Sequence, residues 1–301
     1  MASASGNAVV KRRAVVGAGL GVALLGGCAF SPDQDHSGPD APREQPLARP
    51  PGTAWVFSSG GPRGFVHVGV VKALSELGLA PYLLVGASIG SLVAVVYASG
   101  MPARDIERLA LDLQPLSLGR LAMGGSERFS GNPIADMVRA ETGALPLERL
   151  RIPVACVAAS RGDGRLAAFT AGDAGLALQA SCAIEGQFSP VRIRGVQYVD
   201  ADQYQPLPVR LARRLGAGRV LAVDASAHED KAPPSAARYR EGDLRKRAAT
   251  EPDTRAANLV LHPDFGYYVS LSRDFRERAI EAGYRATLNQ AAALRTLHNP
   301  G

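Results

Sequence analysis

The sequence is short of cysteine, of clustered positive charge and of repeated segments. It has three cysteines in 301 residues. Cys156 and Cys182 lie in apolar surroundings, and the sequence leaves both a disulfide and two buried thiols open. The net charge is +6, and no basic patch is large enough to indicate nucleic-acid binding. With 46% hydrophobic and 21% charged residues, the chain is instead typical of a soluble globular protein with one large core.

The first 28 residues lack an apolar run long enough to span a membrane. Basic residues at 11–13 precede an apolar stretch over 14–25. A bilayer span needs about 20 apolar residues, so the pattern predicts a secretory signal. The ending Leu-Gly-Gly-Cys resembles a bacterial lipobox, which implies lipidation of Cys28 and export to the periplasmic face of the outer membrane. Ordinary signal cleavage and a membrane-anchored start are the alternatives.

The segment after this signal is poor in apolar residues. Residues 29–52 hold six prolines and scattered charges, which is the composition of an extended, unpacked tether. The sequence therefore predicts three parts: a signal peptide over 1–28, a Pro-rich tether over 29–52 that holds the protein off a membrane surface, and one folded domain over 53–301.

A Gly-x-Ser-x-Gly motif lies near the start of that domain. It reads Gly86-Ala87-Ser88-Ile89-Gly90 and stands between an apolar run over 82–85 and a helical pattern. A nucleophile elbow requires this context, because its serine sits on a tight, strained strand-to-helix turn. Glycines two residues before and after the serine let the strand and helix approach without Cβ clashes. Ser88 is therefore the predicted nucleophile, and Gly86, Ile89 and Gly90 form its elbow.

A second glycine-rich turn precedes the first motif. It reads Gly60-Gly61-Pro62-Arg63-Gly64, between an apolar run over 54–57 and a helical pattern over 66–77. Such a turn exposes backbone N–H groups beside a helix N-terminus, where negative charge is stabilised. A phosphate-binding loop or a plain tight turn has the same pattern. Beside a nucleophilic serine, however, it predicts an oxyanion hole formed by the N–H groups of Gly60, Gly61, Arg63 and Gly64.

The two motifs in this order resemble patatin-like phospholipases. The likeness continues to about Val209, and Asp200, ahead of a Leu-Pro-Val, falls on the family's catalytic aspartate. The resemblance implies an α/β fold, a three-layer α/β/α sandwich with a mainly parallel central sheet. It also implies a Ser88–Asp200 dyad, no metal or other cofactor, and hydrolysis of (lyso)phospholipid or related lipid esters through an acyl-serine intermediate. The family's glycines after the aspartate are replaced here by Ala201 and Asp202.

Two other interpretations remain open. The altered motif after Asp200 is compatible with a non-catalytic lipid-binding lipoprotein that keeps the fold. An α/β-hydrolase esterase with a Ser-Asp-His triad is the second, because His262 alone among five histidines follows a late strand, as a triad histidine should. Against the triad, the elbow follows only one clear strand besides its own. If Asp200 and Asp202 both faced Ser88, their repulsion would raise the pKa of one of them. The spacing to the Leu-Pro-Val favours instead a bend after Asp200, with Asp202 facing solvent or paired with an arginine such as Arg63 or Arg210.

The rest of the chain predicts alternating helices and strands. Residues 228–256 carry seven basic and six acidic side chains, which indicates a solvated helix or mobile loop, with contact to a lipid surface as the alternative. The segment after the elbow helix is expected to line an acyl pocket or to join the core through Leu116, Leu118, Leu121 and Met123. Helices are expected over 102–113, 132–141 and 210–215 and at the C-terminus, and strands over 152–159, 165–170, 219–225 and 259–262.

Overall fold

The computed structural model of the chain describes residues 34–47, 52–114, 119–121 and 127–299, apart from the side chains of residues 120 and 121. The predicted signal peptide and Cys28 lie outside the described residues. So do Leu116, Leu118 and Met123, together with the side chain of Leu121. Among the described helices, none combines the length and the hydrophobicity that crossing a membrane would demand.

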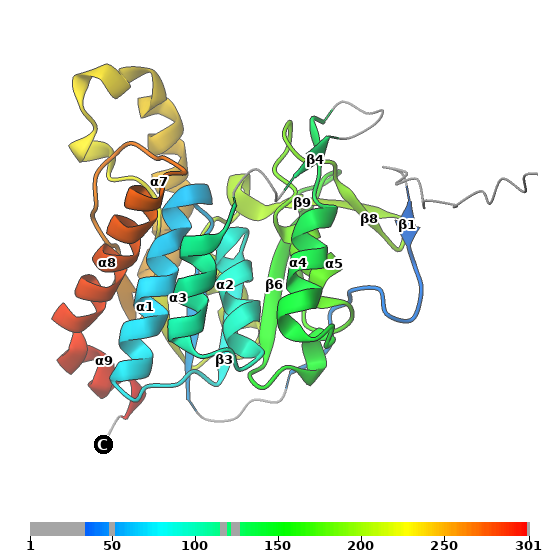
Figure 1. The fold of residues 1–301 in the computed structure, drawn as a ribbon, viewed down its shortest axis with the longest axis horizontal. Coiled ribbons are helices and arrows are strands. Elements are labelled where there is room, and N and C mark those ends of the chain that lie inside the picture. Colours follow the sequence, from blue (N-terminus) through cyan, green and yellow to red (C-terminus); the bar gives the residue numbers. More distant parts are fainter. Residues whose placement is uncertain (1–33, 48–51, 115–118, 122–126, 300–301) are drawn as a thin grey trace, which may run out of the picture. The chain divides into compact units, whose positions relative to one another are not determined.

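A mixed sheet forms the middle layer of the domain (Figure 1). In the described residues it has nine strands, ordered β1-β8-β9-β6-β3-β2-β10-β11, with β7 also paired to β6. The neighbours from β6 to β11 are parallel, whereas β7 and β9 are antiparallel to β6. The strands are β1 (Asp35–His36), β2 (Thr53–Phe57), β3 (Leu83–Ala87), β6 (Val154–Ser160), β7 (Leu166–Phe169), β8 (Val191–Ile193), β9 (Val196–Asp200), β10 (Arg219–Val223) and β11 (Leu259–Leu261). A separate small ribbon pairs β4 (Arg120–Leu121) with β5 (Phe129–Ser130).

The central strands are apolar along their whole length because both faces of the sheet are covered. Alternate side chains of β2 enter different cores: Trp55 and Phe57 face one, Ala54 and Val56 the other. This is the period of two that a strand imposes, in the continuous apolar run typical of buried parallel sheets. The fold is therefore an α/β sandwich, as predicted.

Helices cover both faces unequally (Figure 1). The larger core lies under α1 (Phe65–Glu76), α2 (Ile89–Ala98), α3 (Ala103–Asp112), α4 (Asn132–Thr142), α5 (Ala174–Ser181), α8 (Arg273–Asn289) and α9 (Ala291–His298). The smaller core lies under α6 (Val209–Arg214), against which α7 (Arg240–Ala256) packs. The helices and strands predicted from periodicity are present with ends shifted by a few residues.

Helices α1 and α8 approach so closely that only glycine fits between them. A Cβ atom on Gly69 would lie 1.8 Å from the Ile280 carbonyl oxygen, and one on Gly283 would lie 2.1 Å from the Val66 carbonyl oxygen. The last long helix of the chain is thereby fastened to the first helix of the domain, directly after the glycine-rich turn.

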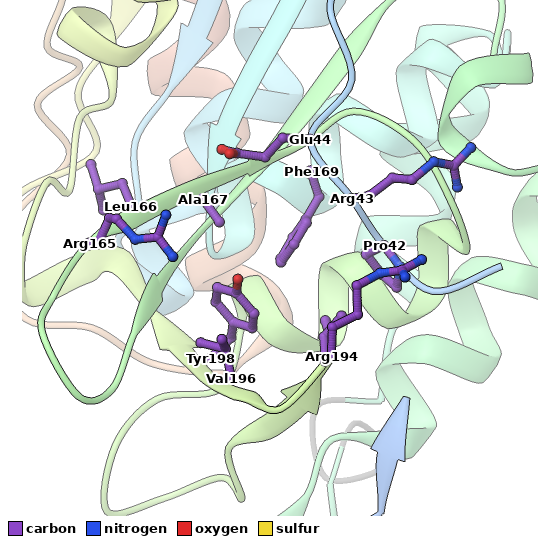
Figure 2. A pocket seen from close by; sticks show the side chains of 11 residues that line it. Pro42, Arg43, Glu44, Arg165, Leu166, Ala167, Phe169, Arg194, Val196 and Tyr198 are labelled. Atoms are coloured by element: carbon purple, nitrogen blue, oxygen red, sulfur yellow. The ribbon is translucent and has the colours of Figure 1, made fainter. Parts of the chain in front are cut away.

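The structure differs from the predicted tether over residues 35–45. Strand β1 pairs with β8, the Arg43 amide donates to the Ala171 carbonyl oxygen at 2.9 Å, and Ala41 is buried. Figure 2 shows Arg43 and Glu44 beside the side chains of β7. The composition misled because these contacts use backbone N–H and C=O groups, which side-chain polarity does not reveal.

Candidate active site

Ser88 lies at the apex of a strained turn between β3 and α2. Its backbone has φ 55° and ψ −127°, a region that costs a residue other than glycine about 1–3 kcal/mol. The turn requires glycine on both sides of the serine. A Cβ atom on Gly86 would lie 2.4 Å from the Ser91 nitrogen, and one on Gly90 would lie 2.5 Å from the Phe57 carbonyl oxygen. The geometry is that of a nucleophile elbow.

Two buried serines that the sequence analysis did not assign support this turn. The Ser181 hydroxyl accepts a hydrogen bond from the Ser88 amide at 2.9 Å and donates one to the Val157 carbonyl oxygen at 2.6 Å. The Ser91 hydroxyl lies 2.8 Å from that of Ser181 and donates to the Gly86 carbonyl oxygen at 2.6 Å. The elbow is thus tied to β6 and α5. The only signal in the sequence was a serine in each of two mainly apolar helices.

Sheet topology brings Asp200 to the elbow. Strand β6 has two edges and pairs with three strands. Strand β3 pairs with it along 154–157, β7 along 156–159 and β9 along 158–160. Because β7 overlaps both of the others, it occupies one edge, and β3 and β9 share the second. Since β3 is parallel and β9 antiparallel to β6, their carboxyl ends meet. Asp200, the last residue of β9, therefore lies beside Ser88.

The Asp200 carboxyl is buried and only partly satisfied. It is 5% exposed; its Oδ1 accepts from the Asp202 amide at 2.9 Å, and its Oδ2 forms no hydrogen bond within the described residues. Burial raises the pKa of Asp200 to about 7, although the nearby Ser88 hydroxyl acts to lower it. The charge of Asp202 raises this pKa further. A carboxylate in this state binds a proton far more readily than one in water.

Asp202 turns away from Asp200 and meets a lysine. The chain bends after Asp200 into a 3-10 turn, Ala201–Gln203, the bend favoured from the spacing to the Leu-Pro-Val. Asp202 then contacts the Lys246 ammonium group at 2.6 Å and accepts from the Ser59 hydroxyl. Burial alone would raise the pKa of Asp202, but Lys246 and Ser59 hold it below its ordinary value.

The predicted arginine partner of Asp202 is therefore wrong. Arg210 pairs instead with the buried Asp253 at 3.1 Å. Lys246 belongs to α7, a helix whose balanced charges gave no sign of which residue it would face.

The glycine-rich turn lies against the elbow, but its four residues differ in role. The Arg63 amide donates to the Gly60 carbonyl oxygen at 3.1 Å, so the prediction of Arg63 as an oxyanion donor is wrong. Gly64 serves close packing, because a Cβ there would lie 2.2 Å from Ile89 Cγ2. The amides of Gly60 and Gly61 have no acceptor in the part of the chain described here, and Gly61 lines the same cavity as Ser88.

The Arg63 side chain fastens this turn to two distant loops. Its Nε donates to the Ala225 carbonyl oxygen at 2.9 Å, and its Nη1 donates to the carbonyl oxygens of Gly266 and Tyr267 at 2.8 and 3.2 Å. Its guanidinium carbon lies 4.4 Å from the centre of the Phe265 ring. Arg63 thus positions the turn through its side chain, whereas the sequence analysis assigned it through its backbone.

A largely apolar cavity of about 380 Å³ opens beside Ser88. An acyl chain has the chemistry to fill such walls, with its ester group at the polar end near Ser88 and Gly61. The apolar walls include Phe65, Leu92, Leu113, Ile134, Phe188 and Leu271.

A second cavity, of about 200 Å³, shares no lining residue with the first (Figure 2). The side chains of Arg43, Arg165 and Arg194 surround it. Its charged walls do not suit an acyl chain.

The histidines have other contacts. The His262 ring stacks on His228 with centroids 3.7 Å apart, and its Nε2 lies 3.1 Å from the Ser226 carbonyl oxygen. Strands β10 and β2 separate β11, which precedes His262, from β3. His67 is fully buried, its Nε2 is 2.9 Å from the Ser58 carbonyl oxygen, and burial lowers its pKa to about 4. The geometry does not assemble the triad of the alternative interpretation.

The two described cysteines are free thiols, which decides the alternative that the sequence left open. Burial raises the pKa of Cys156 to about 12, and it raises that of Cys182 as well. Cys182 lines the cavity beside Ser88. Neither thiol is poised to ionise near neutral pH.

Comparison with known proteins places this site in a family context. Residues 55–213 match the family model described as patatin-like phospholipase. An uncharacterized NTE family protein of Mycobacterium tuberculosis is 30% identical over 182 residues, which cover 60% of this chain and 50% of that protein. Lysophospholipase NTE1 of Mycosarcoma maydis is 29% identical over 191 residues, covering 59% of this chain and 10% of that protein. The chain thus spans half or less of the length of these relatives.

A solved structure shares the fold. VipD from Legionella pneumophila superposes with a TM-score of 0.60 at 15% identity, covering 81% of this chain and 67% of VipD. At that identity the likeness concerns the architecture alone.

Proposed function

The chain belongs to the patatin-like phospholipase family, and we propose that it is a serine acyl hydrolase that cleaves carboxylic esters of lipids. One observation carries this proposal: the end of β9 places the buried, partly unsatisfied carboxyl of Asp200 beside Ser88 on its strained elbow. The apolar cavity at the same point favours a long acyl group. The lysophospholipase among the relatives supports a phospholipid or lysophospholipid as the substrate.

The proposed reaction uses two residues and two amides. Asp200 accepts the proton of the Ser88 hydroxyl while the serine oxygen attacks the ester carbonyl carbon. The N–H groups of Gly60 and Gly61 stabilise the oxyanion of the tetrahedral intermediate. When the intermediate collapses, the alcohol leaves with the proton from Asp200 and an acyl-serine remains. Asp200 then accepts a proton from water while the water oxygen attacks the acyl carbonyl carbon. When this second intermediate collapses, Asp200 returns the proton to the Ser88 oxygen and the fatty acid leaves.

The raised pKa of Asp200 makes a dyad without histidine plausible. A carboxylate with the usual pKa near 3.9 is a poor base for a serine hydroxyl. At about 7, its basicity approaches that of a histidine, and the proton transfer to it becomes correspondingly less uphill.

Release of fatty acid by the purified protein tests the proposal. We expect saturable release from lysophospholipid micelles and from a soluble short-chain ester, undiminished by a metal chelator. A protein that binds the lipid and releases no fatty acid from either substrate would instead be the non-catalytic lipid-binding lipoprotein.

The pH profile follows from the protonation of Asp200. Below pH 7 the carboxyl carries its proton and does not accept one from Ser88, so kcat/KM for a soluble ester should fall by about tenfold per pH unit on the acid side. It should level off above pH 7 to 8. Assays from pH 5 to 9 measure the profile, and dilution from pH 5 into pH 8 checks that the loss is reversible. Full activity at pH 5 would exclude a base with this pKa.

A further inference from the structure

An unusual share of the exposed apolar surface lies in one part of the chain. Eight large hydrophobic side chains are exposed in the described residues, and five of them fall within 239–271. Clustered exposed apolar groups are rare on soluble proteins and mark interaction sites. The five are Tyr239 at 45%, Leu244 at 43%, Tyr268 at 53%, Val269 at 52% and Leu271 at 49% exposed.

These side chains come from two segments that pack together. The Tyr268 hydroxyl lies 2.5 Å from that of Ser235 in η6 (Pro234–Tyr239), and the Tyr267 hydroxyl donates to Asp243 in the first turn of α7. The rings of Tyr267 and Tyr268 are 5.4 Å apart at their centroids. Residues 267–271 and 238–247 therefore form one surface, here named the α7–α8 surface.

This surface adjoins the proposed active site. Leu271 lines the cavity beside Ser88, so an exposed apolar side chain stands where the cavity meets solvent. Arg63 of the glycine-rich turn holds the carbonyl oxygens of Gly266 and Tyr267. In Figure 1 the segment before α8 lies at the end of the sheet where α1 begins. A partner that covers the α7–α8 surface is thus brought to the mouth of the cavity.

The charge of the surface indicates the sign of its partner. Residues 238–247 carry five basic and two acidic side chains. Three of the basic groups are in ion pairs with Glu241, Asp202 and Glu229. Arg238 and Arg240 are exposed and form no ion pair within the described residues, and Arg238 covers the ring of Tyr239 at 4.6 Å. Arginine and tyrosine around aliphatic side chains are suited to the headgroup region of a bilayer.

We propose that the α7–α8 surface docks on a bilayer that contains anionic lipids, with Tyr268, Val269 and Leu271 entering the headgroup boundary. This proposal rests on the proposed function, because a lipid must leave the bilayer before its ester group can reach Ser88. The arginines attract the anionic surface, the apolar side chains hold it, and Leu271 joins the membrane to the cavity wall.

Vesicle binding tests the apolar part of the proposal. It is measured in a Ser88→Ala background, so that hydrolysis does not alter the vesicles, with phosphatidylcholine vesicles that contain phosphatidylglycerol. The double variant Tyr268→Ser/Val269→Ser should bind at least about tenfold more weakly, since two half-exposed side chains lose their burial. Leu288→Ser, near the other end of α8, removes an exposed leucine and should bind like the parent.

Lipid composition tests the electrostatic part. Arg238→Gln/Arg240→Gln should lower affinity for the anionic vesicles by about fivefold per arginine, since each basic residue near an anionic surface contributes about 1 kcal/mol. Affinity for pure phosphatidylcholine vesicles should not change. Equal loss on both vesicles would overturn the assignment of these arginines.

Two further readouts separate this proposal from the proposed function. With Ser88 present, the Tyr268→Ser/Val269→Ser variant should hydrolyse a soluble ester like wild type and a vesicle ester poorly. If that variant binds vesicles as tightly as its parent, the docking surface is wrong and the proposed hydrolase function stands. If the wild-type protein binds vesicles but hydrolyses neither ester, the proposed function is wrong and the docking surface stands. Self-association of the parent that the same substitutions abolish, without vesicle binding, would assign the surface to a second copy of the chain.

Discussion

Ser88→Ala is expected to lower the turnover of a soluble carboxylic ester by on the order of 10³-fold or more, because it removes the atom that forms the covalent intermediate. The same change should abolish labelling by a fluorophosphonate, which reacts with activated serines. Ser88 alone among its neighbours occupies the apex of the elbow, with a carboxyl beside it and two open amides near it. Peptide mass spectrometry of the labelled protein should place the adduct on Ser88.

Other serines supply the controls for this prediction. Ser99→Ala removes a hydroxyl at the far end of α2 that donates to the Val96 carbonyl oxygen at 2.7 Å, and it should leave turnover and labelling unchanged. Ser59 and Ser91 are buried and should remain unlabelled in wild type. Wild-type labelling no greater than that of Ser88→Ala would refute the nucleophile and favour a lipid-binding protein.

Asp200→Asn is expected to lower kcat/KM by on the order of 10²-fold or more, as removal of a general base usually does. Asparagine keeps the acceptor for the Asp202 amide but takes no proton from Ser88. The fold should not suffer. The pKa of Asp200 is raised to about 7 in the folded protein, so the stability that its protonated form contributes at low pH is lost as pH rises through 7. At pH 8 the variant should therefore melt no lower than wild type.

The matched control is the neighbouring carboxylate. Asp202→Asn, His67→Gln and His262→Gln should each stay within about tenfold of wild type, since none of these side chains is placed to accept the Ser88 proton. Circular dichroism melts at pH 8 confirm that each variant is folded before its activity is compared. If His262→Gln loses activity while Asp200→Asn retains it, the dyad is wrong and the triad interpretation returns.

The elbow was predictable because its information is local. Gly86, Ser88 and Gly90 lie within five residues of one another, and the steric demand that fixes them is a property of one turn. The fold class was implied by the resemblance to patatin-like phospholipases, and the pattern of short apolar strands alternating with helices agrees with it. Asp200 was assigned by resemblance to the family. Its position beside Ser88 depends on β3 and β9, which share one edge of β6. Each of these strands pairs with β6 across tens of residues of sequence, and such pairing leaves no local trace in the sequence.

Other features were missed because they depend on which backbone groups remain free. The amide of Arg63 looked as available as those of Gly60 and Gly61, yet it closes the turn onto Gly60. Strand β8 turns into β9 through Arg194 at φ 50° and Gly195 at φ 81°, a tight hairpin whose first residue gave no glycine signal. In both cases the residue type did not reveal the conformation or the hydrogen bonds of the backbone.

The reach of Arg63 bears on how much of this chain is needed for an autonomous catalytic unit. The segment that matches the family model ends at residue 213, before Ala225 and Gly266, whose carbonyl oxygens hold the Arg63 guanidinium. It also ends before β10, which covers one edge of β2, and before α8. Excised alone, that segment would have an unpaired apolar strand edge and a glycine-rich turn detached from its supports. The segment that matches the family model is thus an incomplete folding unit. The region after residue 213 completes it by pairing with β2 and by binding the Arg63 side chain.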